Sequence, residues 1–108
     1  MAIDAELRQR VRDALADRNA EEKRMFGGIS FLVEGRLVVG VRHDGDLLVR
    51  VDPRAGERLA AEPGAQQALM GGRSMGPSWI AAHPDALTGD GLGTWLGHAL
   101  AFHDAAAD

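Results

Sequence analysis

Three short apolar runs between residues 25 and 53 constrain the fold more than any other part of the chain. They read ISFLV, RLVVGV and LLVRV, and they are separated by turns at Glu34 and Gly35 and at Asp44 and Gly45. Apolar runs of this length joined by glycine-bearing turns are typical of antiparallel hairpins. The stretch therefore predicts a three-stranded meander. Because so small a sheet is not stable alone in water, its apolar face needs a cover.

Segments on both sides of the meander supply that cover. Apolar residues recur at helical spacing over residues 2–16 and again from about residue 88 or 90 to near the C-terminus. Asp52 and Pro53 predict the N-cap and first turn of a further helix over residues 53–62. Residues 17–22 are polar and predict a loop, with a helical turn at 20–22 left open. Residues 73–75 and 78–82 predict two strand fragments, or one strand interrupted at Gly76 and Pro77.

These segments together predict a single α+β domain that covers residues 1–108. The expected architecture has two layers, an antiparallel sheet of about five strands covered by helices. The expected order of elements is α-β-β-β-α-β-β-α.

Side-chain alternation along the strands predicts which face meets the helices. The residues expected inside are Ile29, Phe31, Val33, Leu37, Val39, Val41, Leu47, Val49 and Val51. Those expected on the opposite face form the candidate interaction surface: Leu32, Val38, Leu48, Arg36 and Arg50. A half-apolar outer face favours contact with a protein partner or with a second copy of the chain as a homodimer. Isolated apolar residues on an ordinary surface are the alternative.

Composition and spacing exclude several kinds of chemistry. The chain has no cysteine, which removes thiol catalysis and thiolate metal sites, and its net charge of -4 disfavours indiscriminate binding to nucleic acid. His98 and His103 are five positions apart on the last predicted helix, so their side chains point in different directions and cannot bind one metal ion together. We therefore predict no catalytic, cofactor-binding or metal-binding residue. No apolar run is long enough to cross a bilayer, so we expect no membrane contact and a cytoplasmic location.

Two glycine-bearing motifs give the chain a family resemblance. The motif residues are Met25, Phe26, Gly27 and Gly28, and, further along, Arg73 and Met75 in the run Gly-Arg-Ser-Met. With Trp79 and a closing helix that carries Trp95, they resemble the N-terminal domain of the TfoX/Sxy family. The resemblance implies a two-layer α+β domain. The name-giving regulators carry a second, C-terminal domain, and we expect this chain to depart from them as a stand-alone N-terminal domain. Those regulators act as transcriptional co-activators in natural competence and have no known enzymatic activity.

Three functions are compatible with these observations. We favour a non-enzymatic regulatory or adaptor domain, linked to transcription regulation, that works through protein–protein contacts. The first alternative is a regulator that binds nucleic acid directly, with its cations gathered on one side: Lys23, Arg24, Arg36, Arg42, Arg50 and Arg73. The second is an enzyme or a binder of small anionic ligands that uses Arg50 and Arg73 in a concave pocket. Salt bridges to neighbouring carboxylates are the simpler explanation of the arginines.

Overall fold

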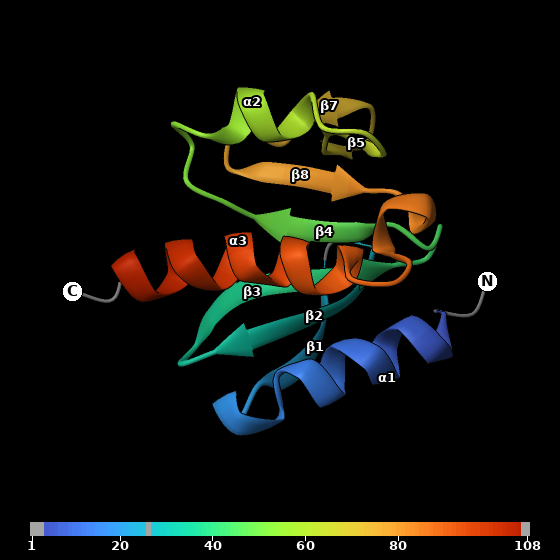
Figure 1. The fold of residues 1–108 in the computed structure, drawn as a ribbon, viewed down its shortest axis with the longest axis vertical. Helices are drawn as coiled ribbons and strands as arrows, with labels where there is room; N and C mark the ends of the chain where they lie inside the picture. The colour runs from blue at the N-terminus through green and yellow to red at the C-terminus, as the bar shows by residue number, and fades with distance from the viewer. Residues whose placement is uncertain (1–3, 26, 107–108) are drawn as a thin grey trace.

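A computed structural model describes residues 4–25 and 27–106 as helices packed on one face of an antiparallel sheet (Figure 1). The helices are α1 (Ala5–Ala14), α2 (Gly56–Ala60) and α3 (Gly91–Ala106), with short 3-10 helices at Ala16–Arg18 and Pro84–Leu87. The strands are β1 (Glu21–Met25), β2 (Gly28–Val33), β3 (Arg36–Arg42), β4 (Leu47–Arg50), β5 (Ala65–Gln67), β6 (Leu69–Met70), β7 (Arg73–Ser74) and β8 (Trp79–Ala82).

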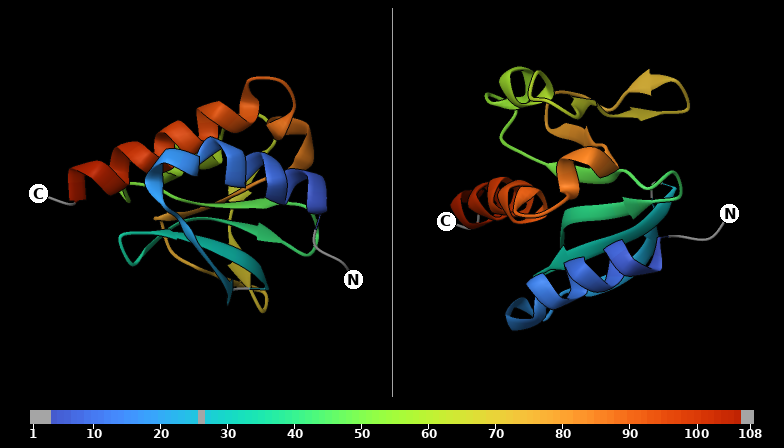
Figure 2. Two further views of the ribbon diagram at one scale, coloured as in Figure 1. Left: turned by 90° about the horizontal axis from the view of Figure 1, so that it is seen from below. Right: turned by 45° about the vertical axis from the view of Figure 1, so that its right-hand side comes forward.

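The main sheet confirms the predicted α+β class. Its six strands run in the order β1-β2-β3-β4-β8-β5, and every neighbouring pair is antiparallel. Helices α1 and α3 lie on the same face of this sheet (Figure 2). Strands β6 and β7 form a separate two-stranded sheet, which projects from the body in the right-hand view of Figure 2.

Strand β1 was not predicted from the sequence. Its run EEKRM is mostly exposed, and we expected residues 17–22 to form a loop. Pairing with β2 makes it a strand, with Met25 opposite Gly28. Glu22 also binds helix α1, because its carboxylate accepts hydrogen bonds from Arg8 and Arg12 at 2.7–2.9 Å. The strand is therefore specified by its neighbours rather than by its own apolar pattern.

A β-bulge changes the predicted faces of β3. The pairing shifts between Phe31 and Leu32, so that Phe31 faces Val39 while Leu32 faces Leu37. The extra residue, Val38, belongs to the main core and is 1% exposed, whereas Leu37 lies outside that core cluster. The predicted outward direction of Val38 and inward direction of Leu37 are wrong, because one inserted residue reverses the alternation beyond it.

The segment between β4 and β8 differs in detail from the prediction. Helix α2 begins at Gly56 with Ala55 as its N-cap, a few residues later than expected. The Asp52 carboxylate instead accepts a hydrogen bond from the Arg54 backbone N–H at 2.9 Å, which forms a turn before the helix. A Cβ at position 56 would lie 1.8 Å from the Pro77 carbonyl oxygen. The two predicted strand fragments form β7 and β8, of which β8 joins the main sheet and β7 pairs with β6 outside it.

The buried residues of the two long helices recur at helical spacing. In α1 and the residue after it these are Leu7, Val11 and Leu15, and in α3 they are Leu92, Trp95, Leu96, Ala99 and His103. The Asp4 carboxylate caps α1 by accepting a hydrogen bond from the Leu7 N–H. The predicted helix start at Ala2 and Ile3 lies outside the described residues. Among the described helices, none combines the length and apolar character that a membrane span requires.

Candidate functional site

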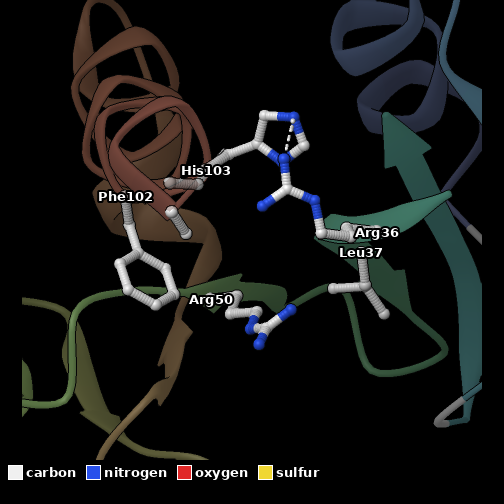
Figure 3. A pocket seen from close by; sticks show the side chains of 7 residues that line it. Arg36, Leu37, Arg50, Phe102 and His103 are labelled. Atoms are coloured by element: carbon white, nitrogen blue, oxygen red, sulfur yellow. Dashed lines mark hydrogen bonds between the residues drawn. The ribbon is translucent and has the colours of Figure 1, made fainter. Parts of the chain in front are cut away.

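The ends of β3 and β4 separate next to helix α3, and a cavity opens between them. The ladder between these strands joins only Val39–Val41 to Leu47–Val49, so it stops before Arg36 on one strand and Arg50 on the other. The last turns of α3 complete the walls. The cavity measures about 20 Å³ and is lined by Arg36, Leu37, Arg50, Ala99, Phe102, His103 and Ala106 (Figure 3).

Arg50 is the most unusual residue of this cavity. Its Nε atom is buried and has no hydrogen-bond partner. The carbon of its guanidinium lies 5.8 Å from the ring centre of Trp79, its cross-strand neighbour, and 5.6 Å from that of Phe102 on α3. Such cation–π contacts favour the charge but satisfy no N–H donor. Because most buried polar groups in proteins are hydrogen-bonded, this atom requires an explanation.

His103 joins the opposite wall to the sheet. Its ring is 4% exposed, and its Nε2 atom lies 3.4 Å from an Arg36 nitrogen and 3.1 Å from a Glu34 oxygen. Figure 3 shows the contact between Arg36 and His103. A single ring nitrogen either accepts from Arg36 or, when protonated, donates to Glu34. The protonation of Nε2 therefore decides which of the two contacts is a hydrogen bond.

The candidate interaction surface predicted from the sequence is not exposed. Leu32, Val38 and Leu48 are 8%, 1% and 0% exposed, respectively. Leu48 packs against Ala68 and Ala81 in a small second cluster, which Met75 and Trp79 flank. The prediction of an exposed, half-apolar face is therefore wrong, because the bulge turns Val38 inward and this second cluster covers Leu48. Of the five predicted surface residues, Arg36 and Arg50 meet at the cavity.

The arginines are not arranged as direct nucleic-acid binding or an anion site at Arg50 and Arg73 would require. Arg73 is exposed on β7 and does not line the cavity, where Arg50 is joined by Arg36 instead. The other cations are divided between the two faces of the sheet. Arg24 pairs with Ile29 on the helix side, whereas the neighbouring Lys23 pairs with Ser30 and points the opposite way. The predicted cations therefore do not form one basic face.

The glycine motifs build hairpin turns. Gly27 has a φ of 76°, and a Cβ at Gly28 would lie 2.0 Å from the Val41 carbonyl oxygen. Gly71 and Gly72, with φ values of 60° and 80°, form the turn between β6 and β7. Positive φ at both central residues is the mark of a type I′ turn, which favours glycine. Phe26, the remaining motif residue, lies outside the described residues.

Reasoning from the sequence missed two features. The first is the meeting of His103 and Phe102 with Arg36 and Arg50, since the helix and the strands are far apart in the chain. The second is a pair of exposed apolar side chains on the β6–β7 hairpin, Leu69 at 43% and Met70 at 37% exposure. The adjacent glycine pair was the available signal for this hairpin.

The comparisons with known proteins concern the whole domain. The family model of the TfoX N-terminal domain matches residues 6–103. Curated proteins and solved structures gave no match. The described residues contain no group of three or more histidine or acidic side chains that could hold a metal ion.

Proposed function

Because the chain belongs to the TfoX N-terminal domain family, we propose that it is a non-enzymatic regulatory or adaptor domain that works through protein–protein contacts. The proposal includes a link to transcription regulation through the protein partner. The observation that carries it is the β6–β7 hairpin. This hairpin presents the exposed side chains of Leu69 and Met70, which we call the hairpin surface.

Hydrogen bonds attach the β6–β7 hairpin, and with it the hairpin surface, to the rest of the domain. A two-stranded hairpin is at best marginally stable alone, so hydrogen bonds must attach it to the domain. The Met75 N–H donates to the Ala68 carbonyl at 3.0 Å, and the Ala68 N–H donates to the Trp79 carbonyl at 3.0 Å. The Gln67 side chain donates to the Gly76 carbonyl at 2.6 Å. A preorganised apolar protrusion of this kind loses little conformational entropy when it enters a partner's groove.

The edges of the main sheet favour contact through the hairpin over strand addition. Edge strand β1 carries Glu21, Glu22, Lys23 and Arg24, and charged edges oppose pairing with another chain. The other edge strand, β5, is only three residues long. Both edges therefore offer a poor template for an added strand.

The cavity beside Arg50 also supports a non-enzymatic role. Its polar lining consists of Arg36, Arg50 and His103, which do not pair a nucleophile with a base. The division of the cations between the two sheet faces argues against direct binding to nucleic acid, which needs them on one side.

A comparison of wild-type protein with the double variant L69S/M70S tests the proposal. Each would be used as bait in the native host, and co-purifying proteins would be identified by mass spectrometry. Gln66→Ser, an exposed change outside the hairpin surface, is the matched control. We expect the control to retain the wild-type partners and the double variant to lose them while keeping its circular dichroism spectrum. Equal capture by both baits, or no capture by wild type, would contradict the proposal.

A second copy of the chain is the other partner to test. If copies meet through the hairpin surface, wild type should sediment as a dimer and L69S/M70S as a monomer. A dimer that survives the double substitution would place the self-contact elsewhere.

A further inference from the structure

The guanidinium of Arg50 carries a charge for which the described part of the chain provides no anion. Arg50 makes no ion pair there, and its Nε atom is buried without a hydrogen-bond partner. Two carboxylates close to Arg50 in the sequence are used elsewhere. Asp52 binds Arg54, and Asp46 binds His83. The salt bridges expected from the sequence therefore do not account for Arg50.

The surroundings hold this charge in place. Trp79 and Phe102 lie 5.8 Å and 5.6 Å from the guanidinium carbon, one on the neighbouring strand and one on helix α3. Aromatic rings at this distance stabilise a cation and restrict its motion without using its donors. Arg50 is thus positioned before any ligand arrives, and its N–H groups remain available for a planar, two-oxygen acceptor.

The cavity next to Arg50 is cationic and small. Two carboxylates lie near Arg36 and Arg50: Glu34 contacts His103, and Asp104, which interacts with Arg36, is bound by Arg18. With Arg18 counted, three arginines face two carboxylates, so these side chains carry a net positive charge even when His103 is neutral. The carboxyl end of α3 at Ala106 adds a partial negative charge, which offsets only part of it. A volume of about 20 Å³ accommodates one or two water-sized groups.

We propose that this cavity binds a carboxylate group, with Arg50 as the main donor and Arg36 as the second. The two oxygens of a carboxylate match the size of the cavity and the planar fork of an arginine. A tetrahedral phosphate is larger than a carboxylate and fits a cavity of this volume less well. The carboxylate belongs either to a small organic acid or to a peptide. The proposal is independent of the hairpin surface, because the two share no residue.

Titration followed by NMR tests the proposal directly. The N–H signal at Nε of Arg50 would be recorded while sodium acetate is added, with sodium chloride at equal ionic strength as reference. A ligand of so few atoms should bind with a dissociation constant on the order of 1–10 mM. We expect saturable shifts at Arg50 and Arg36. Arg50→Lys and Arg36→Gln should each weaken binding at least about tenfold, since one bidentate contact contributes a factor of this order. Arg73→Gln, on the exposed hairpin, should leave it unchanged.

Further additions distinguish the sources of the carboxylate. A short peptide with a free C-terminus would be compared with the same peptide amidated. If the free peptide binds more tightly than acetate and the amidated peptide does not bind, the ligand is a peptide. Equal binding of acetate and free peptide indicates a small acid. The proposal is overturned if acetate shifts Arg50 no more than chloride does, if inorganic phosphate binds more tightly than acetate, or if folded Arg50→Lys binds acetate as wild type does.

Discussion

At the scale of single residues, the motif glycines and the cavity arginine differ in how far the sequence alone predicts their roles. The pairs at 27 and 28 and at 71 and 72 could be predicted as tight turns, because glycine next to an apolar run usually marks one. Arg50 could be singled out as a cation on a strand. Its companions could not, since His103 lies 67 positions from Arg36 and only the packed fold brings them together. Arg73 was chosen from the motif, and the separate hairpin keeps it out of the cavity.

Gly28→Ala tests the structural role of the first glycine pair. The added methyl group would lie 2.0 Å from the Val41 carbonyl oxygen, so β2 and β3 must move apart. We expect a loss of about 2–3 kcal/mol in the free energy of unfolding, measured with urea. Gly93→Ala is the control. That position lies in α3, where an added Cβ would meet no atom within 4 Å apart from its chain neighbours and the adjacent helix backbone, and alanine there should stabilise the protein by roughly 0.5–1 kcal/mol. Equal effects of the two changes would contradict the assignment.

At the scale of secondary-structure elements, the strands with strong apolar runs could be predicted and the polar one could not. Strands β2, β3 and β4 carry apolar residues bounded by turns. Strand β1 is charged and becomes a strand only because β2 pairs with it. The bulge in β3 could not be predicted either, because Leu37, Val38 and Val39 are all apolar and each could lie on either face of the sheet.

Substitution of Val38 tests the bulge. Since its side chain is 1% exposed in the main core, Val38→Ala should cost roughly 2 kcal/mol, and Val38→Asp should prevent folding. Leu69→Asp places the same charge on an exposed apolar position and should leave the fold intact. Circular dichroism and urea unfolding give the comparison. A stable, native-like Val38→Asp protein would mean that the side chain points away from the helices.

The attachment of β1 to α1 should depend on pH. Hydrogen bonds from Arg12 and then Arg8 lower the pKa of Glu22 to about 2, from an ordinary value of 4.5. A lowered carboxyl pKa stabilises the folded protein above the ordinary value, and this contribution disappears as the pH falls toward 2. Glu22→Gln should therefore cost about 1 kcal/mol at neutral pH, because the pair is near the surface.

The measurement is the unfolding free energy of wild type and Glu22→Gln across the acidic range. The difference should be constant above about pH 5 and should shrink steadily below the ordinary carboxyl pKa. A difference that is the same at pH 3 as at pH 7 would show that Glu22 is not held by the two arginines.

At the scale of the whole molecule, the chain returns its C-terminal helix to the region where its N-terminal helix ends. Arg18, just after α1, binds Asp104 near the end of α3 through two hydrogen bonds of 2.8 Å and 3.0 Å. The two-layer α+β arrangement could be predicted, because amphipathic helices flank a short apolar sheet. This ion pair could not, since it depends on where the two helix ends meet.

The pKa of the Asp104 carboxyl group tests whether the two helix ends are in contact. The hydrogen bond with Arg18 lowers the pKa of Asp104 below its ordinary value of 3.8. In Arg18→Gln the pKa should rise toward the ordinary value, as followed by carbon NMR of the side-chain carboxyl. An unchanged pKa would show that the helix ends do not meet in solution.

The central claim about the whole domain is that its sheet and α3 together hold the Arg50 guanidinium between two aromatic rings, beside a cationic cavity. Proton NMR of the free protein tests this most directly, through contacts between the Arg50 side chain and the rings of Trp79 and Phe102. We predict nuclear Overhauser effects to both rings and upfield shifts of the Arg50 side-chain protons, which are reduced in Phe102→Leu. Random-coil shifts at Arg50, with no contact to either ring, would contradict the account.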